Sequence, residues 1–280
     1  MNDFLTYPAT AFGKPVCRLG LASRGGTRLT AADVLYALDR GVNFLNWPGE
    51  ADSPGGADGL SDAIAALGPQ RERLVVCVQF GARTSADAAV ELHTILSTLR
   101  TDYIDVLTLY YVEHDDEWRQ LCGNGGALGC LQRAKQDGVV RRIGVTSHQR
   151  PLAARMAASG LIDVLMIRYN AAHRGAERDI FPTTAARQIP VIAYTALRWG
   201  ALLRPTPADL PGFVVPPARD WYRFVLQSPS VAVVLAAPDD RHELEHDVEA
   251  LTVGEPLSDS EYRQLAEHGH RVRRSAGMFP

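Results

Sequence analysis

Lysine is scarce in this chain of 280 residues: it occurs only at Lys14 and Lys135, and arginine carries nearly all of the positive charge. A catalytic lysine, whether it forms a Schiff base or assists a proton transfer, must therefore be one of these two. Lys14 precedes the first predicted strand, and Lys135 lies near the end of a predicted helix. Neither position directly follows a strand, so we do not expect lysine catalysis.

Cysteine is also rare, and the four cysteines show no spacing typical of a metal site or a disulfide framework. No apolar run approaches the length of a membrane span, and residues 1–10 lack the basic start and apolar centre of a signal peptide. The formal net charge of -3 and the isoelectric point near 6.2 give no basic footprint for nucleic acid. We therefore expect a cytoplasmic protein that acts on a small molecule, with no membrane and no nucleic-acid partner.

Short apolar runs of β type alternate with helical patterns along the chain. The predicted strands are residues 16–22, 42–46, 74–79, 104–109, 142–146, 164–168, 191–195 and 231–236. Thr30, Thr84 and Ser258 each stand three positions before an acidic residue and predict helix starts. The alternation predicts one α/β domain over residues 1–280, closed into a (β/α)8 TIM barrel. An open doubly wound sheet is the alternative, although no strand-to-helix turn carries G-x-G-x-x-G.

Several segments resemble one known family in the same order and spacing. They are GVNF at residues 41–44, DYIDVL at 102–107, GVVRRIGV at 138–145, VIAY at 191–194 and GALL at 200–203. Together they span nearly the whole chain and are similar to the aldo-keto reductase family. The resemblance implies a (β/α)8 barrel. It also implies reduction of a carbonyl by NADPH, with a tyrosine as the proton donor, a lysine–aspartate pair that lowers the pKa of that tyrosine, and a histidine that orients the substrate.

All four positions of that catalytic tetrad differ in this chain. The resemblance places the aspartate at Asn46, the tyrosine at Ala51, the lysine at Gln79 and the histidine at Tyr110. Without a cation beside it, a phenol keeps a pKa near about 10 and is a poor proton donor at neutral pH. Asn46 and Gln79 replace an ion pair with two amides that can hydrogen-bond without a buried charge, which favours retooling over decay. Standard NADPH-dependent carbonyl reduction is therefore not expected.

The positions that hold the cofactor in the family also depart from its pattern. Met166 falls where the resemblance implies a hydrogen bond to the nicotinamide amide, which a thioether cannot supply. Asp239 falls where a basic residue meets the 2′-phosphate, and Asp247 falls on the asparagine that binds adenine. Tyr194 keeps the aromatic ring that stacks on the nicotinamide. We expect no cofactor, with NADH or NADPH as the alternative.

The segment HELEH at residues 242–246 matches H-E-x-x-H, which places two histidines on one face of a helix and is typical of zinc proteases. No third ligand is evident, and the same segment corresponds to an exposed helix of the resembling family. We therefore expect an ordinary exposed helix and no metal.

Three polar residues near strand ends are candidates for acid–base or anion-binding roles. Strand alternation puts Arg168 on the same face as Met166, and an inward face would let Arg168 hold an anion. A salt bridge at the barrel rim is the alternative. His148 follows the fifth predicted strand and has a pKa suited to proton transfer, although a loop histidine without a catalytic role fits the pattern too. Tyr110 either donates a proton or only fills the space of the missing histidine.

The leading hypothesis is an enzyme that catalyses a non-redox acid–base reaction, such as a dehydration, cyclisation, isomerisation or lyase reaction. Its substrate is a small metabolite, and an anionic metabolite is one option. Tyr110, His148 and Arg168 carry the reaction above the Asn46–Gln79 pair, and Trp47, Tyr194 and Met166 form the pocket. An arginine-rich, lysine-poor composition is associated with specialised metabolism.

Two other functions stay open. The first alternative is an NAD(P)-dependent oxidoreductase with a non-standard proton donor, in which a shifted loop brings Tyr7, Tyr111 or Tyr169 to the missing position. The second is a non-catalytic barrel that acts as a partner or regulator.

Overall fold

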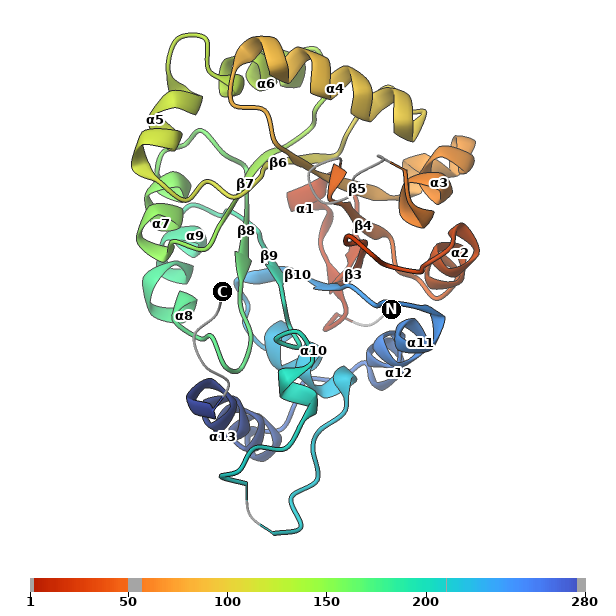
Figure 1. Ribbon diagram of the computed structural model, residues 1–280, viewed down its shortest axis with the longest axis vertical. Helices are drawn as coiled ribbons and strands as arrows, with labels where there is room; N and C mark the ends of the chain where they lie inside the picture. Colours follow the sequence, from red (N-terminus) through yellow and green to blue (C-terminus); the bar gives the residue numbers. More distant parts are fainter. Residues whose placement is uncertain (1–2, 50–56, 210, 276–280) are drawn as a thin grey trace.

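Eight parallel strands close into a barrel in the computed structural model, which describes residues 3–49, 57–209 and 211–275 (Figure 1). The order around the barrel is β10-β3-β4-β5-β6-β7-β8-β9. Its strands are β3 (Leu19–Ala22), β4 (Phe44–Trp47), β5 (Val75–Phe80), β6 (Val106–Leu109), β7 (Ile143–Ser147), β8 (Val164–Arg168), β9 (Val191–Tyr194) and β10 (Val231–Ala236). Strand β10 pairs with both β3 and β9, so the predicted (β/α)8 barrel is confirmed and the open sheet is excluded.

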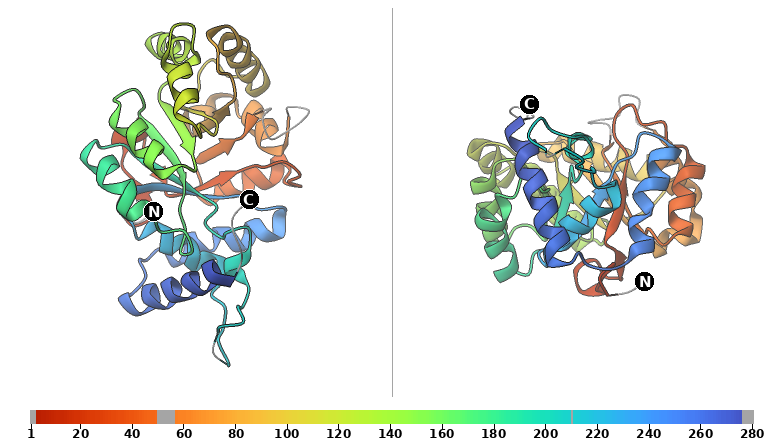
Figure 2. Two further views of the ribbon diagram at one scale, coloured as in Figure 1. Left: turned by 60° about the vertical axis from the view of Figure 1, so that its left-hand side comes forward. Right: turned by 90° about the horizontal axis from the view of Figure 1, so that it is seen from below.

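Helices form a layer around the strands, as Figures 1 and 2 show. They are α2 (Ala31–Asp39), α3 (Gly59–Ala66), α4 (Ser85–Leu99), α5 (Asp115–Cys122), α6 (Ala127–Gln136), α7 (Arg150–Ala158), α8 (Ala176–Asp179), α9 (Phe181–Ala186), α10 (Ala218–Leu226), α11 (Arg241–Val248), α12 (Ala250–Val253) and α13 (Asp259–Ser275), with 3-10 turns η2 (Gly68–Arg73) and η3 (Ala201–Leu203). Across the part of the chain that the structure describes, none of the helices has the length and apolar character needed to cross a membrane.

The predicted helix starts are present. Thr30 caps α2 and forms a capping box with Asp33, Thr84 caps α4, and Ser258 exchanges hydrogen bonds with Glu261 at the start of α13. These side chains satisfy backbone N–H groups that a helix start leaves without partners.

The first predicted strand, residues 16–22, is interrupted. Its beginning forms β2 (Val16–Cys17), which pairs antiparallel with β1 (Thr6–Tyr7), and a short helix, α1 (Ala9–Phe12), lies between them. The Arg18 amide donates to the Leu5 carbonyl instead of continuing the barrel strand. Phe12 packs edge-on against Phe44, with ring centroids 5.5 Å apart, so this hairpin closes the amino-terminal end of the barrel.

Side chains alternate between the barrel interior and the layer under the helices. Phe44, Cys77, Val106 and Met166 belong to the interior cluster, whereas their chain neighbours pack against the helices. Burial raises the pKa of the Cys77 thiol, which supports the expectation of an inert core cysteine. Apolar residues fill the lower barrel, so polar groups reach the interior only near the carboxyl ends of the strands.

A buried carboxylate at the other end of the barrel holds together segments that are far apart in the sequence. Asp105 is 1% exposed, and its oxygens lie 3.4 Å from Lys14 Nζ, 2.7 Å from an Arg71 guanidinium nitrogen and 3.1 Å from an Arg141 nitrogen. The Val76 amide also donates to it at 3.0 Å. One of the two lysines is therefore structural.

The second lysine is structural as well. Lys135 Nζ donates to both carboxylate oxygens of Asp163, at 2.6 and 2.7 Å. The same carboxylate accepts a hydrogen bond from the Ile143 amide at the start of β7. Lys135 therefore fixes the entry to this strand.

Replacing the buried carboxylate should destabilise the protein strongly. Asp105→Asn removes the charge that balances the buried Arg71 guanidinium, and we expect a loss of about 3–5 kcal/mol in the free energy of unfolding. Urea titration followed by circular dichroism measures this loss. Asp102→Asn is the matched control because Asp102 is exposed, and it should change the stability by less than about 0.5 kcal/mol. Equal losses in the two variants would contradict this role of Asp105.

Candidate active site

A cavity of about 980 Å³ opens at the carboxyl ends of the barrel strands. Its inner part is lined from β4, β5, β7 and β9, and its outer arm runs between the loop of residues 195–204 and α11. Both Lys14 and Lys135 lie elsewhere, so neither lysine lines this cavity. Barrel enzymes hold their chemistry at this end, which makes the cavity the candidate active site.

Neutral amides form the floor of the cavity. The Gln79 amide nitrogen donates to the Met166 sulfur at 3.6 Å, which directs the other atom of this amide, Oε1, elsewhere. Gln79 Oε1, Asn46 Oδ1 and Thr146 Oγ1 are buried and have no hydrogen-bond partner among the described residues. Asn46 and Gln79 therefore form no hydrogen bond with each other, since neither amide oxygen has a partner among the described residues. The floor instead presents oxygen atoms that a bound molecule could satisfy.

The structure corrects two of the expected pocket residues. Met166 is fully buried in the barrel interior and supports Gln79 from below rather than lining the cavity. Trp47 is 1% exposed and packs in the layer under the helices, because it follows the inward-facing Asn46 and alternation turns its side chain outward. Tyr194, the third expected pocket residue, does line the cavity.

A histidine and a glutamate form a dyad beside the cavity. His148 lines it, and its Nδ1 lies 3.4 Å from Glu113 Oε1. Glu113 is itself held in place, because it accepts hydrogen bonds from the His148 amide at 2.8 Å and from the Gln149 side chain at 3.2 Å. Burial lowers the pKa of His148, Glu113 opposes this, and the charge of Arg168 lowers the pKa further. The ring is therefore neutral at pH 7, and a proton on Nδ1 leaves Nε2 as the basic nitrogen.

Tyr111 lines the cavity, whereas Tyr110, the expected proton donor, does not. Tyr110 was expected there from the position of the family histidine, but strand β6 ends at Leu109, and the chain turns at Tyr111, whose backbone is left-handed with φ 41°. The Tyr111 ring stacks on His148, with centroids 4.5 Å apart and planes at 16°. Tyr110 packs behind Tyr111 at 4.2 Å between centroids.

Neither of the other two tyrosines considered as substitutes lines the cavity. Tyr7 lies on β1 at the closed end of the barrel. Tyr169 is 1% exposed and donates to Glu177 at 2.7 Å. Tyr194 does line the cavity, but burial raises its pKa well above that of a free phenol, which makes it a poor acid.

Arg168 ends β8, is half-buried and is not among the residues that line the cavity. Its charge is close enough to influence the pKa values of His148 and His173. Burial is the main cause that lowers the pKa of His173 to about 3, and the charges of Arg168, Arg198, Arg273 and Arg150 add to it. Arg168 therefore tunes histidines beside the site, and its position gives little support to direct binding of an anionic substrate.

The outer arm of the cavity is rich in carboxylates. The acidic residues that line it are Asp239, Glu243, Asp247 and Glu249. Arg24 pairs with Asp239, so its charge is already neutralised. His242 and His246 share a face of α11, with ring centroids 4.7 Å apart, yet no group of three or more potential metal ligands occurs within residues 3–49, 57–209 and 211–275.

Ala51, at the position of the family tyrosine, lies outside the described residues, as do Glu50 and Asp52. The sequence-based reasoning gave no weight to Glu113 and only little to Tyr111. Their signal was available: both follow β6, and every loop after a barrel strand contributes to the same end of the barrel.

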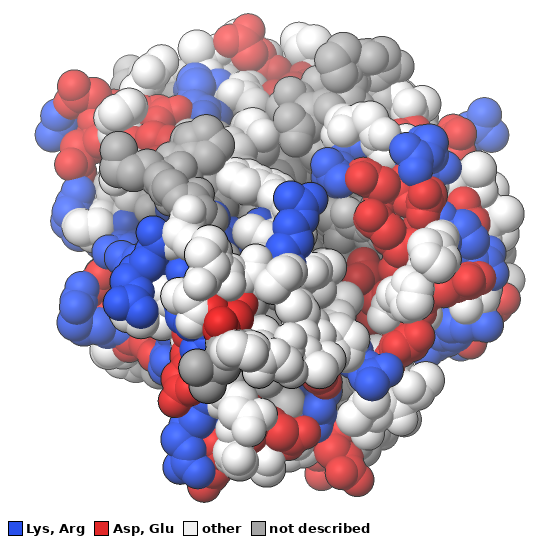
Figure 3. All heavy atoms as spheres, turned by 60° about the horizontal axis from the view of Figure 1, so that its bottom comes forward, with Lys and Arg blue, Asp and Glu red and all other residues white. Residues whose placement is uncertain are grey.

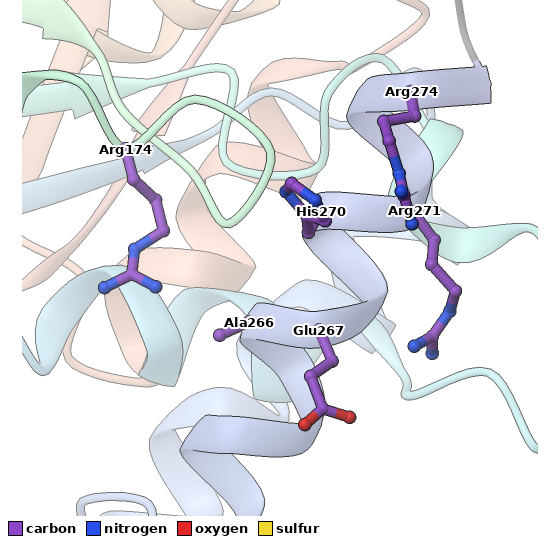
Figure 4. Close-up of a pocket in the computed structure, with 6 residues that line it drawn as sticks. All are labelled: Arg174, Ala266, Glu267, His270, Arg271 and Arg274. Carbon is purple, nitrogen blue, oxygen red and sulfur yellow. The ribbon is translucent and has the colours of Figure 1, made fainter.

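A second depression, of about 460 Å³, lies between Arg174 and the carboxyl-terminal helix α13 (Figure 4). Arg271 points away from Arg174 there and pairs with Asp209, and Arg174 pairs with Glu177. Over the face shown in Figure 3, basic and acidic side chains are intermingled. Two of the three arginines that line the depression are therefore paired with carboxylates.

The low pKa of His173 predicts an acid-sensitive fold. Because its folded-state pKa lies below the unfolded value of about 6.5, the unfolded state binds a proton first as the pH falls. Stability should be lost progressively between pH 6.5 and about 3. His173→Asn should reduce the loss of stability between pH 7 and pH 4, as measured by urea titration at each pH. His93→Asn is the control on the exposed face of α4, and an equal effect of both variants would contradict the prediction.

The amide floor predicts energetic coupling between Asn46 and Gln79. Asn46→Asp and Gln79→Lys each bury one uncompensated charge, and we expect each to lower the free energy of unfolding by more than about 1–3 kcal/mol. The double variant pairs the charges, so its loss should fall below the sum of the single losses by about 0.5–3 kcal/mol. A control double-mutant cycle uses Gln120→Lys, on the exposed face of α5, in place of Gln79→Lys. In this cycle the losses in the free energy of unfolding of Gln120→Lys and Asn46→Asp should add. Additivity in both cycles would show that the floor residues do not interact.

Comparison with known proteins agrees with this architecture. A sequence model of the aldo/keto reductase family matches residues 27–210. An aldo-keto reductase of Bacillus halodurans in its holo form is similar with a TM-score of 0.73 and 19% identity, over 94% of this chain and 95% of that chain. An aldo/keto reductase of Klebsiella pneumoniae in complex with NADP and acetate gives 0.74 and 20%, over 94% of each chain. Identity at this level shows the shared fold, and the family match over more than half of the chain shows its membership. The chain belongs to the aldo/keto reductase family.

Proposed function

We propose that this protein is an enzyme that uses the barrel cavity for acid–base chemistry without hydride transfer, as in a dehydration, cyclisation, isomerisation or lyase reaction. The observation that carries the proposal is the His148–Glu113 dyad at a cavity whose floor is made of neutral amides. The dyad supplies a base that is neutral at pH 7, and the floor supplies no cation that would activate a phenol.

The proton transfer follows from the geometry of the dyad. Glu113 lies at the Nδ1 side of His148, so Nε2 can take a proton from a substrate carbon or hydroxyl group. The imidazolium that forms is stabilised by the Glu113 carboxylate and returns the proton at the leaving group or at a neighbouring carbon. Tyr111 fixes the plane of the ring by stacking on it and is a positioning residue.

The residues in the cavity do not fit a phosphorylated nicotinamide cofactor. Asp239, Glu243 and Asp247 place carboxylates along the outer arm, where a phosphate would be repelled. Two arginines, Arg24 and Arg204, line the same cavity, and Arg24 is already paired with Asp239. At the inner end, Met166 lies below the floor and cannot reach a carboxamide. The arrangement therefore supports chemistry in which the substrate itself supplies all reacting atoms.

An NAD(P)-dependent oxidoreductase is the second candidate. It is favoured by the NADP found in the Klebsiella structure and by the continuity of the cavity from the barrel mouth to α11. Tyr111 would then be the proton donor, since it lines the cavity and Tyr194 is a poor acid.

Titration with NADPH and NADH separates the two candidates. We expect neither to bind saturably, because carboxylates replace cations along the outer arm. Isothermal calorimetry and quenching of tryptophan fluorescence measure binding independently. Saturable binding of either cofactor would restore the oxidoreductase as the first candidate.

Variants of the dyad test the proposed chemistry once turnover is observed in buffer free of nicotinamide. His148→Asn should lower kcat/KM by about 10²–10⁴-fold, because it removes the base. Glu113→Gln should move the acid limb of the pH profile to lower pH, because the Glu113 carboxylate raises the pKa of His148 and the variant removes it. His114→Asn, exposed in the same loop, is the control and should leave kcat/KM unchanged. Full activity of His148→Asn would reject the dyad as the catalytic group.

A further inference from the structure

The outer arm of the cavity holds two carboxylates without a cationic partner. The charged side chains that line this arm are Arg24, Arg204, Asp239, Glu243, Asp247 and Glu249. Arg24 pairs with Asp239, and Arg219 holds Glu249 at 2.9 Å. Within the described part of the chain, no Lys, Arg or His forms a salt bridge with Glu243 or Asp247, which lie one helical turn apart on α11. Arg204 lines the same arm and forms no salt bridge with either of them, so Glu243 and Asp247 are the carboxylates of the arm that a cationic group of a ligand could pair with.

Asp247 is the deeper of these two carboxylates. It is 5% exposed, and its hydrogen-bonded neighbour is the uncharged Tyr222 hydroxyl. Burial raises the pKa of Asp247 to about 7, Tyr222 opposes the rise, and the charge of Glu243 adds to it. A cation between the two carboxylates would remove this repulsion and hold Asp247 in its charged form.

The inner end of the same cavity needs hydrogen-bond donors. Asn46 Oδ1, Thr146 Oγ1 and Ser23 Oγ have no hydrogen-bond partner among the residues that the structure describes, although their residues are only 3%, 1% and 5% exposed. Gln79 Oε1 also lacks a partner among the described residues. The hydrogen bond from the Gln79 amide nitrogen to Met166 sets the orientation of this amide. The amide oxygens of Asn46 and Gln79 only accept, whereas the hydroxyls of Ser23 and Thr146 both donate and accept, so a ligand with O–H groups, which also do both, can satisfy the whole floor.

We propose that the natural ligand of this cavity is a hydroxylated amine of about disaccharide size, such as an amino sugar. Its ammonium group lies at Glu243 and Asp247, and its hydroxyl groups donate to the oxygens of the floor. A cavity of about 980 Å³ has room for a molecule that reaches both ends. Tyr194, which is partly exposed, also lines the cavity and offers an aromatic ring to a sugar or a cation.

This inference rests on the proposed function only in treating the cavity as a substrate site. The amine preference is measured by binding, without turnover and without His148. A positive nicotinamide titration would overturn the proposed chemistry and leave the amine preference to be judged by its own result.

Three matched disaccharides test the preference: the dimer of glucosamine, its neutral counterpart cellobiose, and the anion cellobionate. Ligand-observed NMR titration at pH 7, where the amino sugar still carries ammonium groups and Asp247, with a pKa of about 7, is ionised in part, gives their dissociation constants. We expect the glucosamine dimer to bind about tenfold or more tightly than cellobiose, as a charge-assisted hydrogen bond provides. Cellobionate should bind more weakly than cellobiose.

Two variants locate the ammonium site. Asp247→Asn and the exposed Glu243→Gln should each bring the affinity for the glucosamine dimer toward that for cellobiose, while binding of cellobiose persists. Glu245→Gln is the control on the same helix, because Glu245 is exposed and pairs with Arg241 at 2.8 Å outside the cavity. Equal affinity for all three sugars, tighter binding of cellobionate, an equal effect of Glu245→Gln or no binding of any sugar would overturn the proposal.

Discussion

Alternation of side chains along the parallel strands determines what this protein can do. The interior of the barrel is filled with apolar groups such as Phe44, Cys77 and Val106, so only the last inward residue of a strand reaches the cavity. Asn46, Gln79, Thr146 and Tyr194 occupy such positions. About one residue per strand therefore forms the floor, while the loops after β6 and β7 add Glu113 and His148, and a change of a few such side chains can replace a reaction without disturbing the barrel below it.

The few buried charges are distributed according to the same constraint. Asp105 is balanced by surrounding cations at the amino-terminal end of the barrel, where the charges tie the first loop to neighbouring strands. At the carboxyl-terminal end, the Asn46–Gln79 floor carries no charge. A lone charge there would be costly, because Met166 below it is fully buried and offers only a thioether. The neutral floor preserves the fold and removes the field that a reductase needs for its phenol.

The sequence predicts the barrel well because the signals for it are local. Apolar strand patterns and caps such as Thr30 and Thr84 depend on neighbouring residues, and the structure retains them. The first strand is predicted too long, because the interruption at Arg18 depends on a bond to Leu5, which no periodicity reveals. The order of several motifs in the sequence also predicts the family, and the match to the family model confirms it.

The site is predicted less well because small changes of backbone direction decide which side chain enters the cavity. Tyr111, with its left-handed φ, takes the place expected for Tyr110. Trp47 and Arg168 were predicted to take part in the site because an aromatic ring and a cation near strand ends suit a pocket, yet neither residue lines the cavity.

The charges around the cavity also differ between its two sides, and this difference links the dyad to the outer arm. On the β8 side, burial lowers the pKa values of His148 and His173, and the charge of Arg168 lowers both further. On the α11 side, the carboxylate of Glu243 lies one helical turn from Asp247, whose pKa burial raises to about 7 and which a bound cation would hold in its charged form. A molecule with an ammonium group would be drawn to α11 and would present its uncharged end to His148. The charge of Arg168 has two effects on such a substrate. It repels an ammonium group that approaches His148, and it lowers the pKa of His148, which keeps this base neutral. A substrate without a positive charge would lack this orientation, so the charge asymmetry favours one direction of binding and one reacting end.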